Sequence, residues 1–497
     1  MRTVPSAEEC FSQRKAEISL SVRVRDVPLK RMHPRIQRLK QKKKTDLKRP
    51  EREKGQTDME IKILGAGLAG CEAAWQAAKR GINVKLYEMK PEKHTPAHSY
   101  NGFAELVCSN SLRGSDVTQG VGLLKEELRR LGSLIMEAAD ATAVAAGGCL
   151  AVDRYAFSDY ITKKINECPL IEVIEGEVTE IPDEGICVVA TGPLTSDTLA
   201  GKISDLVGGK KLSFFDAAAP IVDFSTIDMT KAFFASRYDK GTPDYINCPM
   251  TEDEYKAFYD ALINAEEAQL HDFEKGEGIK VFEGCMPVEV MASRGEDTLR
   301  YGPMKPVGIH HPETGERYYA VVQLRRENEE GTMFNIVGFQ THLTFPEQRR
   351  VFRMIPGLEN ADFLRYGVMH RNTFLNSPGL LSRDFSMVKR PDLYFAGQMT
   401  GVEGYVESCA SGFVAGLNAA RRAMEKEPYI FPDTMMIGAM AKYVSVGSEA
   451  DFQPMNANFG IIARSPEKIK GGKKVRYQFY ADRALKETDR IISEEEL

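Results

Sequence analysis

A glycine-rich hexapeptide carries the clearest chemical signal in the sequence. Gly65-Ala66-Gly67-Leu68-Ala69-Gly70 fits the pattern G-x-G-x-x-G, in which the three glycines permit a tight turn, close approach to a pyrophosphate, and tight packing of a helix on a strand. Glu88 lies 23 residues after Gly65, near the spacing expected for an acid that binds ribose hydroxyls. A plain glycine-rich turn is the alternative. The spacing favours a dinucleotide site for a ribose without a 2′-phosphate.

Two later segments indicate which dinucleotide to expect. Val188-Val189-Ala190-Thr191-Gly192 has the pattern of a strand that ends in a small turn, and Phe395-Ala396-Gly397 opens a second glycine-rich segment. Both resemble segments of FAD domains of the glutathione-reductase type, which are built from two parts. We therefore expect FAD rather than NAD, with Thr191, Gly192 and Gly397 among its binding residues.

Two cysteines lie in segments that suit covalent chemistry. Cys108 belongs to a polar stretch, residues 105–113, and Cys285 stands between Gly284 and the dipeptide Met286-Pro287. A thiolate is a strong nucleophile, and neighbouring cations favour the thiolate form. Many cysteines are instead small hydrophobic residues of the core. The residues alone leave both readings open.

The elements that must position these residues follow from hydrophobic periodicity. Strands are predicted at 60–64 and 83–88, with a helix at 68–79 between them, so that the hexapeptide opens the helix. Further elements are expected at 120–145 and 155–168 (helices), 171–175 and 185–190 (strands), 393–397 (strand) and 411–426 (helix).

Residues 206–342 have a different texture, because aromatic and β-branched runs alternate with turns there. Strands are expected at 221–224, 231–238, 280–282, 318–324 and 334–339, with one helix at 252–275. The predicted fold is therefore α/β. A Rossmann-like FAD-binding domain of the glutathione-reductase type, in two parts at 59–205 and 343–449, is split by a smaller strand-rich α+β insertion domain at 206–342. A C-terminal segment follows at 450–497.

Composition bounds the function classes. The 497 residues are too many for one core, and a hydrophobic content of 42% with mean hydropathy −0.33 is typical of a soluble globular protein. No apolar run approaches the roughly 18 residues that cross a bilayer, so no membrane partner is expected. The nine cysteines form no CxxC pair and no secretory signal is present, which predicts thiols in the cytoplasm. The histidines show no metal-ligand spacing, so no metal site is predicted.

Charge is distributed unevenly. Residues 1–58 carry a charge of about +9 and the remainder about −14, so that any RNA contact must rely on local basic patches. One such patch combines cations with aromatic residues near the C-terminus, where a solvated face is the alternative: Lys468, Lys470, Lys473, Lys474, Arg476, Tyr477, Phe479 and Tyr480. For residues 1–58 we expect a disordered extension outside the fold rather than an RNA-binding arm, because Met59 directly precedes the first strand.

Four segments together resemble one family. Residues 65–70, 108–113 (CSNSLR), 285–289 (CMPVE) and 401–408 (GVEGYVES) are similar to the folate- and FAD-dependent tRNA (uracil-5-)-methyltransferases of bacteria. The resemblance runs from residue 59 to about residue 458, and the basic tail before it departs from the family pattern. Each segment alone is unspecific, whereas their combination is highly specific.

The resemblance implies methylation of C5 of the T-loop uridine, position 54, of tRNA. Methylenetetrahydrofolate would supply the carbon, reduced FAD the hydride, and NADPH or NADH the electrons. A thiolate adding to C6 would make C5 nucleophilic, and a base would then remove the C5 proton. The uridine must leave its stack to reach such a site.

The resemblance also implies roles for four side chains. Cys285 would be the C6 nucleophile and Cys108 the second catalytic thiol, which manages the C5 proton; the two roles could be exchanged. Tyr405 would pack against the flavin and help hold the folate or the uracil, unless it is a core aromatic residue. Arg113 would stabilise an anion, unless it is a surface ion-pair partner.

Three other functions compete with this one. The same chemistry could act on ribosomal RNA, or a related flavoprotein of the glucose-inhibited-division class could modify wobble uridines with a GTPase partner. A non-catalytic FAD-bearing RNA-binding module is the third alternative. The two cysteine segments favour the tRNA methyltransferase. The oligomeric state is left open.

Overall fold

The computed structural model describes residues 60–494, with gaps at 96, 210, 218, 240, 269–285, 312–313, 368, 448–451 and 468. Cys285, Lys468, the tail 1–58 and the strand predicted at 280–282 therefore lie outside the described residues. Among the residues described, no helix combines the length and the apolar character needed to span a membrane.

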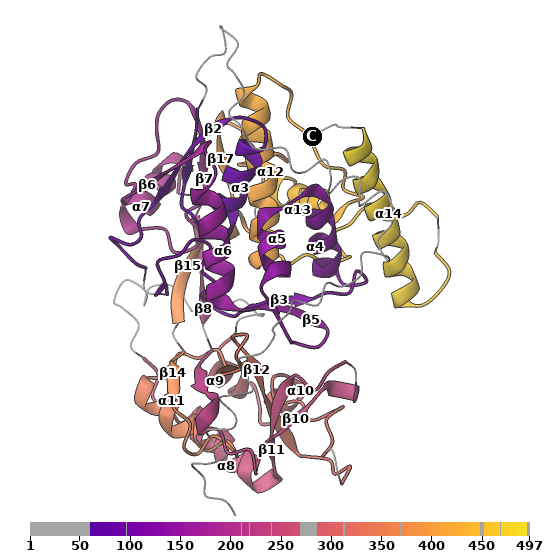
Figure 1. Cartoon of the computed structure of the whole chain (residues 1–497). Helices are drawn as coiled ribbons and strands as arrows, with labels where there is room; N and C mark the ends of the chain where they lie inside the picture. Colours follow the sequence, from indigo (N-terminus) through magenta and orange to yellow (C-terminus); the bar gives the residue numbers. More distant parts are fainter. Residues whose placement is uncertain are drawn as a thin grey trace, which may run out of the picture. The chain divides into compact units, whose positions relative to one another are not determined.

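A six-stranded sheet organises the first core (Figure 1). Its order is β16-β17-β7-β1-β2-β6, and every neighbouring pair is parallel except β16 with β17. The strands are β1 (Glu60–Leu64), β2 (Asn83–Glu88), β6 (Ile171–Glu175), β7 (Ile186–Val189), β16 (Ser386–Met387) and β17 (Arg390–Phe395). Every residue of β7 is buried, as expected for a parallel strand covered on both faces. The predicted α/β class and the strands predicted in this sheet are confirmed.

Two helices pack closely against each other beside this sheet: α3 (Leu68–Ala78) and α12 (Tyr405–Ala423). A Cβ atom added at Gly412 would lie 2.2 Å from the carbonyl oxygen of Ala69, and one at Gly416 would lie 2.4 Å from Cα of Ala73. The two contacts advance together, so the helices run in the same direction. α12 begins at Tyr405, six residues before the predicted start, because the chain enters the helix directly after Gly404, at φ +119°.

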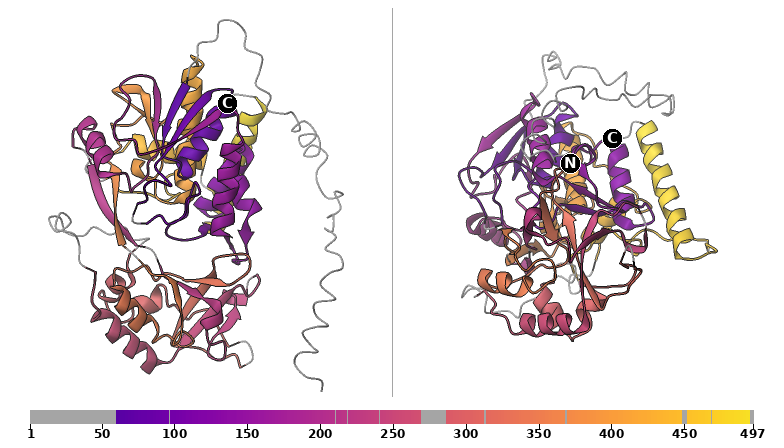
Figure 2. Two further views of the ribbon diagram at one scale, coloured as in Figure 1. Left: turned by 60° about the vertical axis from the view of Figure 1, so that its left-hand side comes forward. Right: turned by 60° about the horizontal axis from the view of Figure 1, so that its bottom comes forward.

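The other helices of the first core are α4 (Gly120–Leu131), α5 (Leu134–Ala141), α6 (Arg154–Asn166), α7 (Asp197–Leu206), α13 (Met436–Ser445) and α14 (Lys473–Ser493). The stretch predicted to be helical at 120–145 forms two helices, α4 and α5, and is wrong at residues 143–144, which form a short strand. The chain breaks at Gly132, in the left-handed region at φ +81°, and the Ser133 side chain caps α5. α14 lies along α4, where Arg130 pairs with Asp489 at 2.9 Å (Figure 2).

A small antiparallel sheet, order β3-β5-β4, completes this part: β3 (Ser111–Gly114), β4 (Ala143–Val144) and β5 (Cys149–Val152). Its first strand, β3, includes the end of the Cys108 stretch. A two-stranded antiparallel ribbon of β8 (Lys211–Ala217) and β15 (Met369–Leu375) connects the first core with the second.

A second core surrounds another six-stranded sheet, order β10-β11-β12-β13-β9-β14. Its elements are β9 (Ile221–Asp223), β10 (Phe233–Ala235), β11 (Tyr245–Met250), β12 (Ala320–Arg326), β13 (Met333–Ile336), β14 (Phe363–Arg365), α8 (Glu252–Ile263), α9 (Val288–Ala292), α10 (Thr298–Tyr301) and α11 (Phe345–Phe352). We call this part the insertion domain.

Two sequence predictions for the insertion domain need correction. Its end at residue 342 is too early, because β14 pairs with β9 and Phe352 and Ala361 belong to its core. The helix predicted at 252–275 ends at Ile263, followed by Asn264 in a non-helical conformation. The sequence pattern also missed β11, which contains a proline and reads as an irregular stretch.

A buried acid joins two helices of the first core. Glu127 of α4 is fully buried and accepts hydrogen bonds from the backbone N–H groups of Met436 and Ile437, at 2.7 and 2.9 Å, where α13 begins. Burial raises the pKa of Glu127 to about 7, although both hydrogen bonds act in the opposite direction. The Glu127 side chain thus caps the start of α13, although its burial disfavours the ionised form.

This linkage gives a pH-dependent prediction. The pKa of Glu127 is higher in the folded chain than in the unfolded one, so its stabilising contribution is complete below about pH 4.5 and is lost as the pH rises through about 7. Relative to a Glu127→Gln variant, the native chain should lose up to about 3 kcal/mol of stability between these limits. Thermal midpoints measured from pH 5 to 8 check this. Glu126→Gln, on the exposed face of α4, is the control, and parallel curves for Glu127→Gln would contradict the assignment.

Candidate active site

A pocket lies where the parallel strands of the first sheet end. Its wall is formed by the residues that follow the carboxyl ends of these strands, together with part of the Cys108 stretch and the start of α12. The wall residues include Gly65–Ala69 after β1, Glu88–Lys90 after β2, Gly176–Val178 after β6, Ala190–Ser196 after β7 and Gly397–Gln398 after β17. Ligands of open parallel sheets bind at this edge.

The three glycines of the hexapeptide differ in their surroundings. Gly65 has φ +96°, and a Cβ atom there would lie 2.8 Å from the carbonyl oxygen of Ala190. A Cβ atom at Gly70 would lie 1.8 Å from the carbonyl oxygen of Gly65, so Gly70 supports the turn from beneath and does not line the pocket. A Cβ atom at Gly67 would meet nothing within 4 Å. Gly67 also precedes α3 without a side-chain cap, which leaves helix N–H groups for an anion.

Glu88 is held at the edge of the pocket. One carboxylate oxygen accepts the N–H of Ala66 at 2.9 Å, and the other accepts the N–H of Lys90 at 3.0 Å. The acid therefore ties the hexapeptide turn to the end of β2. Its remaining lone pairs are the acceptors that ribose hydroxyls require.

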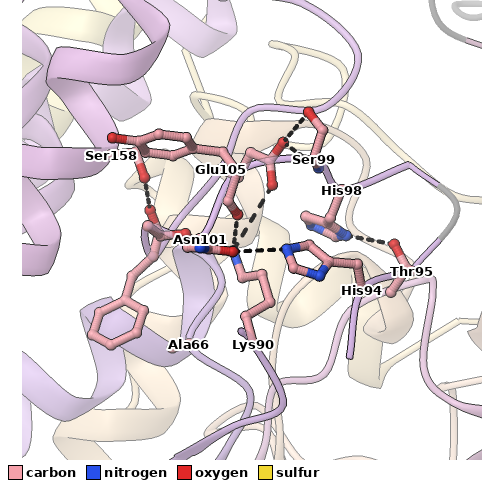
Figure 3. A network of polar contacts seen from close by, with 12 residues as sticks. Ala66, Lys90, His94, Thr95, His98, Ser99, Asn101, Glu105 and Ser158 are labelled. Atoms are coloured by element: carbon pink, nitrogen blue, oxygen red, sulfur yellow. Dashed lines mark hydrogen bonds and ion pairs between the residues drawn. The ribbon is translucent and has the colours of Figure 1, made fainter. Parts of the chain in front are cut away.

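The loop after Glu88 is held by a buried cation, Lys90 (Figure 3). Lys90 donates to the carbonyl oxygens of Tyr100 and Gly102, at 3.2 and 2.5 Å, and its Nζ lies 3.8 Å from the Glu105 carboxylate. Glu105 in turn accepts the N–H of Ser99 at 2.9 Å. These contacts fix residues 99–105, which lead directly into Cys108.

Tyr405 fixes the backbone of Cys108 across 297 residues of sequence. The phenol oxygen accepts the N–H of Cys108 at 2.8 Å and the N–H of Ser109 at 3.2 Å, and both Tyr405 and Cys108 line the pocket. Burial, followed by the nearby Cys108, raises the pKa of Tyr405, so the phenol stays neutral. Tyr405 thus holds the Cys108 turn, while its packing against the flavin stays a prediction.

The residues after Cys108 are anchored one by one. Asn110 is fully buried and donates to the carbonyl oxygens of Val152 and Arg326, both at 2.9 Å. Lys125 of α4 is also buried and donates to the carbonyl oxygens of Leu112 and Arg113, at 2.8 and 2.9 Å. Burial lowers the pKa of Lys125 to about 8. The stretch is therefore a rigid turn.

Arg113 has a partly exposed side chain that serves as an ion-pair partner. Its guanidinium contacts the buried carboxylate of Glu407 and donates to Asn456 Oδ1 at 2.9 Å, and the Glu407 carboxylate also accepts the N–H of Ala457 at 2.9 Å. Arg113 itself adopts φ +63°. It thereby joins the Cys108 turn, the start of α12 and the C-terminal segment.

Four of the other described cysteines are buried in the two cores. Burial raises the pKa of Cys187 and of Cys248 to about 12, and it raises the pKa of Cys71 and Cys409 well above the ordinary value. These four thiols are inert members of the two cores. Cys108 is instead partly exposed and lines the pocket, as a reactive thiol must.

The structure gathers most of the predicted site residues at one place. Those that line the pocket are Gly65, Ala66, Gly67, Leu68, Ala69, Glu88, Cys108, Thr191, Gly192, Gly397 and Tyr405. Sequence reasoning missed Lys90, Glu105 and Gln398, which also line it. Gln398 directly follows the predicted Gly397 and Lys90 lies two residues after the predicted Glu88, so their nearness in sequence was the available signal. Among the residues described, no cluster of histidine, cysteine and acidic side chains could hold a metal ion.

Comparison with known proteins agrees with this architecture. The family model described as glucose inhibited division protein A matches residues 60–427. The methylenetetrahydrofolate--tRNA-(uracil-5-)-methyltransferase TrmFO of Acetivibrio thermocellus is 60% identical over 433 residues, 87% of this chain and 98% of that protein. The protein of the same name from Enterococcus faecalis is 59% identical over 432 residues, with the same coverage.

A solved structure, Aquifex aeolicus GidA in the form II crystal, matches with a TM-score of 0.62 at 18% identity, covering 87% of this chain and 74% of that one. This likeness shows a shared fold. The fold and the pocket thus define an FAD-domain flavoprotein with an insertion. The chain belongs to the glucose inhibited division protein A family and, within it, to the folate- and FAD-dependent tRNA (uracil-5-)-methyltransferases.

The contrast between two glycines gives a prediction for nucleotide binding. Gly67→Ala should fold with an unchanged thermal midpoint when nucleotide-free and yet bind FAD at least about ten-fold more weakly, because its methyl group projects into the open space before α3. The quenching of flavin fluorescence on titration with FAD measures this affinity. Gly70→Ala is the matched comparison and should lower the midpoint, since its methyl group overlaps the Gly65 carbonyl. Equal FAD affinity in Gly67→Ala and the native chain would refute the assignment.

Proposed function

We propose that this protein methylates C5 of the T-loop uridine, position 54, of tRNA, with methylenetetrahydrofolate as carbon donor and reduced FAD as hydride source. One observation carries the proposal. A chain about 60% identical to proteins named methylenetetrahydrofolate--tRNA-(uracil-5-)-methyltransferase places a thiol, Cys108, at the wall of a dinucleotide pocket and fixes it there through Tyr405.

The residues of the pocket fit FAD. Gly67 leaves open space before an uncapped helix, as a pyrophosphate requires, and Glu88 offers acceptors to a ribose with free hydroxyls. Thr191, Gly192 and Gly397 complete the same edge. FAD bound in its reduced form supplies the hydride that completes the new methyl group.

The thiols carry the covalent steps on the uracil. The thiolate of Cys285 adds to C6, forming an S–C6 bond while the C5=C6 electron pair moves to C5. C5 then bonds the one-carbon unit as that unit's bond to one folate nitrogen breaks. Cys108 accepts the C5 proton, and the electron pair of that C–H bond expels the second folate nitrogen, which leaves an exocyclic methylene on C5. When the hydride reaches this methylene carbon, the electron pair of its double bond returns to the ring as C5=C6 and the S–C6 bond breaks, which releases the thiolate and the methylated base. The alternative exchanges the two thiols.

The tRNA would contact the basic start of α14. Lys470, Lys473, Lys474 and Arg476 are exposed there, and Tyr477 stacks on Phe459 with ring centroids 4.4 Å apart. Lysine and arginine bind phosphates, and exposed aromatic rings such as Phe479 can stack on an unpaired base. Asn456 and Ala457, which contact Arg113 and Glu407, lead into this surface along the chain.

Two further features complete the proposal. NADPH or NADH in the cytoplasm would reduce the flavin between turnovers, because the hydride is consumed in each cycle. A cytoplasmic site agrees with the core cysteines, which the described residues hold as thiols.

The direct test incubates the purified protein with methylenetetrahydrofolate, NADPH and unmodified tRNA. We expect 5-methyluridine at position 54, detected by mass spectrometry of nuclease digests. Cys285→Ala should stay yellow and yield no product, whereas retention of full activity would remove Cys285 as the nucleophile. Product with ribosomal RNA alone, or a change at the wobble uridine, would support one of the competing functions. Material that is colourless and cannot be reconstituted with FAD would refute the proposal.

The basic surface predicts a salt-dependent binding defect. Lys473→Glu combined with Lys474→Glu should raise KM for tRNA by about ten-fold or more and flatten its dependence on salt, because phosphate contacts are lost. FAD content and KM for the folate should be unchanged. Lys163→Glu on α6, which is also exposed, is the matched control. If all variants bind tRNA equally, the docking surface lies elsewhere.

A further inference from the structure

The turn between β12 and β13 docks the insertion domain onto the Cys108 stretch. Arg325, near the end of β12, donates to Ser109 Oγ at 2.6 Å and to Asn110 Oδ1 at 3.0 Å. The N–H of Glu329 donates to Asp153 Oδ2 at 3.1 Å, just before α6. The two residues after Cys108 are thereby held by a side chain from the other domain.

Arg154, the first residue of α6, provides the central contact. Its Nε and Nη2 atoms lie 3.1 and 2.8 Å from Glu327 Oε2, and its Nη1 atom contacts the carbonyl oxygen of Leu106, two residues before Cys108. The guanidinium therefore links the backbone of the Cys108 stretch to a carboxylate of the insertion domain. Residues on both sides of Cys108 are tied to the same turn.

The ion pair between Arg154 and Glu327 is buried, so the loss of either partner is costly. The side chains of Arg154 and Glu327 are 6% and 1% exposed. Burial is the largest single influence and lowers the pKa of Arg154, but Glu327, Tyr405 and Cys108 together outweigh it, and the pKa is raised. Removing one member of such a pair leaves an uncompensated buried charge. A lysine cannot replace Arg154, because it lacks the planar fork that reaches two acceptors at once.

From these contacts we propose that Arg154 is a positioning residue, which uses Glu327 to set the Cys108 thiol in register with the insertion domain. The expected effect on kcat rests on the proposed function, whereas the expected effect on the Cys108 turn rests on the contacts alone. Residues on both sides of Cys108 are bonded to Arg154 and Arg325, so the position of the thiol depends on the contact between the two domains.

The experiment compares Arg154→Ala, Arg154→Lys and Glu327→Gln with the native protein. We expect FAD content and KM for tRNA to stay within about three-fold, while kcat falls by about 100-fold in Arg154→Ala, as for a misplaced catalytic group. Added guanidinium chloride, at a concentration that leaves the native enzyme active, should restore part of kcat in Arg154→Ala. Arg129→Ala, which breaks a more exposed two-bonded pair between α4 and Asp140 of α5, should keep native kinetics.

A second measurement needs no methylated product. The rate at which iodoacetamide alkylates Cys108, followed by peptide mass spectrometry, should fall at least about five-fold in Arg154→Ala and recover with guanidinium, because the backbone that presents the sulfur to the cavity is no longer held. Cys149, also partly exposed, is the internal reference. Unchanged alkylation with native kcat would overturn the inference. The inference would also be overturned if Arg154→Ala lost FAD and stability together with kcat, if guanidinium restored none of them, and if Glu327→Gln behaved in the same way. If the native protein lacked methyltransferase activity, the proposed function would be refuted, and the alkylation rates would still test the role of Arg154.

Discussion

The close contact between α3 and α12 is the constraint on which the pocket depends. Gly412 and Gly416 bring the backbone of α12 against Ala69 and Ala73, and no side chain fits between the two helices. Because the helices run in the same direction, their first turns reach the same edge of the sheet. The start of α3 and Tyr405, the first residue of α12, thereby line the same cavity. A wider separation of the helices would move the Cys108 turn away from the nucleotide.

The Cys108 turn is held by contacts from every side, and these explain its composition. Asn110 supplies donors to two strands of different domains, and Ser109 offers an oxygen to Arg325. Lys125 satisfies the carbonyl groups that the turn leaves unpaired, at the cost of burying a cation. Small polar residues are needed because each must reach a fixed partner within a short turn. Rigidity of this kind is what a thiol requires if its sulfur is to meet a substrate without reorganisation.

The sequence predicted what depends on local pattern. Hydrophobic periodicity predicts the parallel strands of the first core and the acid at the end of β2. The spacing of the glycines reflects turns with positive φ, which favour glycine. The break at Gly132 and the late end of the insertion domain were not predicted. The end of the domain depends on the tertiary packing of Phe352 and Ala361. Contacts such as Tyr405 with Cys108, or Arg154 with Glu327, join residues 297 and 173 positions apart. No periodicity encodes such a pairing.

The fold also sets where specificity must reside. A protein of the same family with 18% identity shares the architecture at a TM-score of 0.62, so the sheet and its helices tolerate almost complete substitution. We propose that specificity lies instead at the edge where the strands end, with a phosphate after β1, a sugar after β2 and a thiol in the turn that follows. Of the described cysteines that the sequence scatters along the chain, four have been buried to the point of inertness, whereas Cys108 meets the cavity. Chemistry in this fold is therefore a property of which loop carries the thiol, and of the contacts that keep that loop in place.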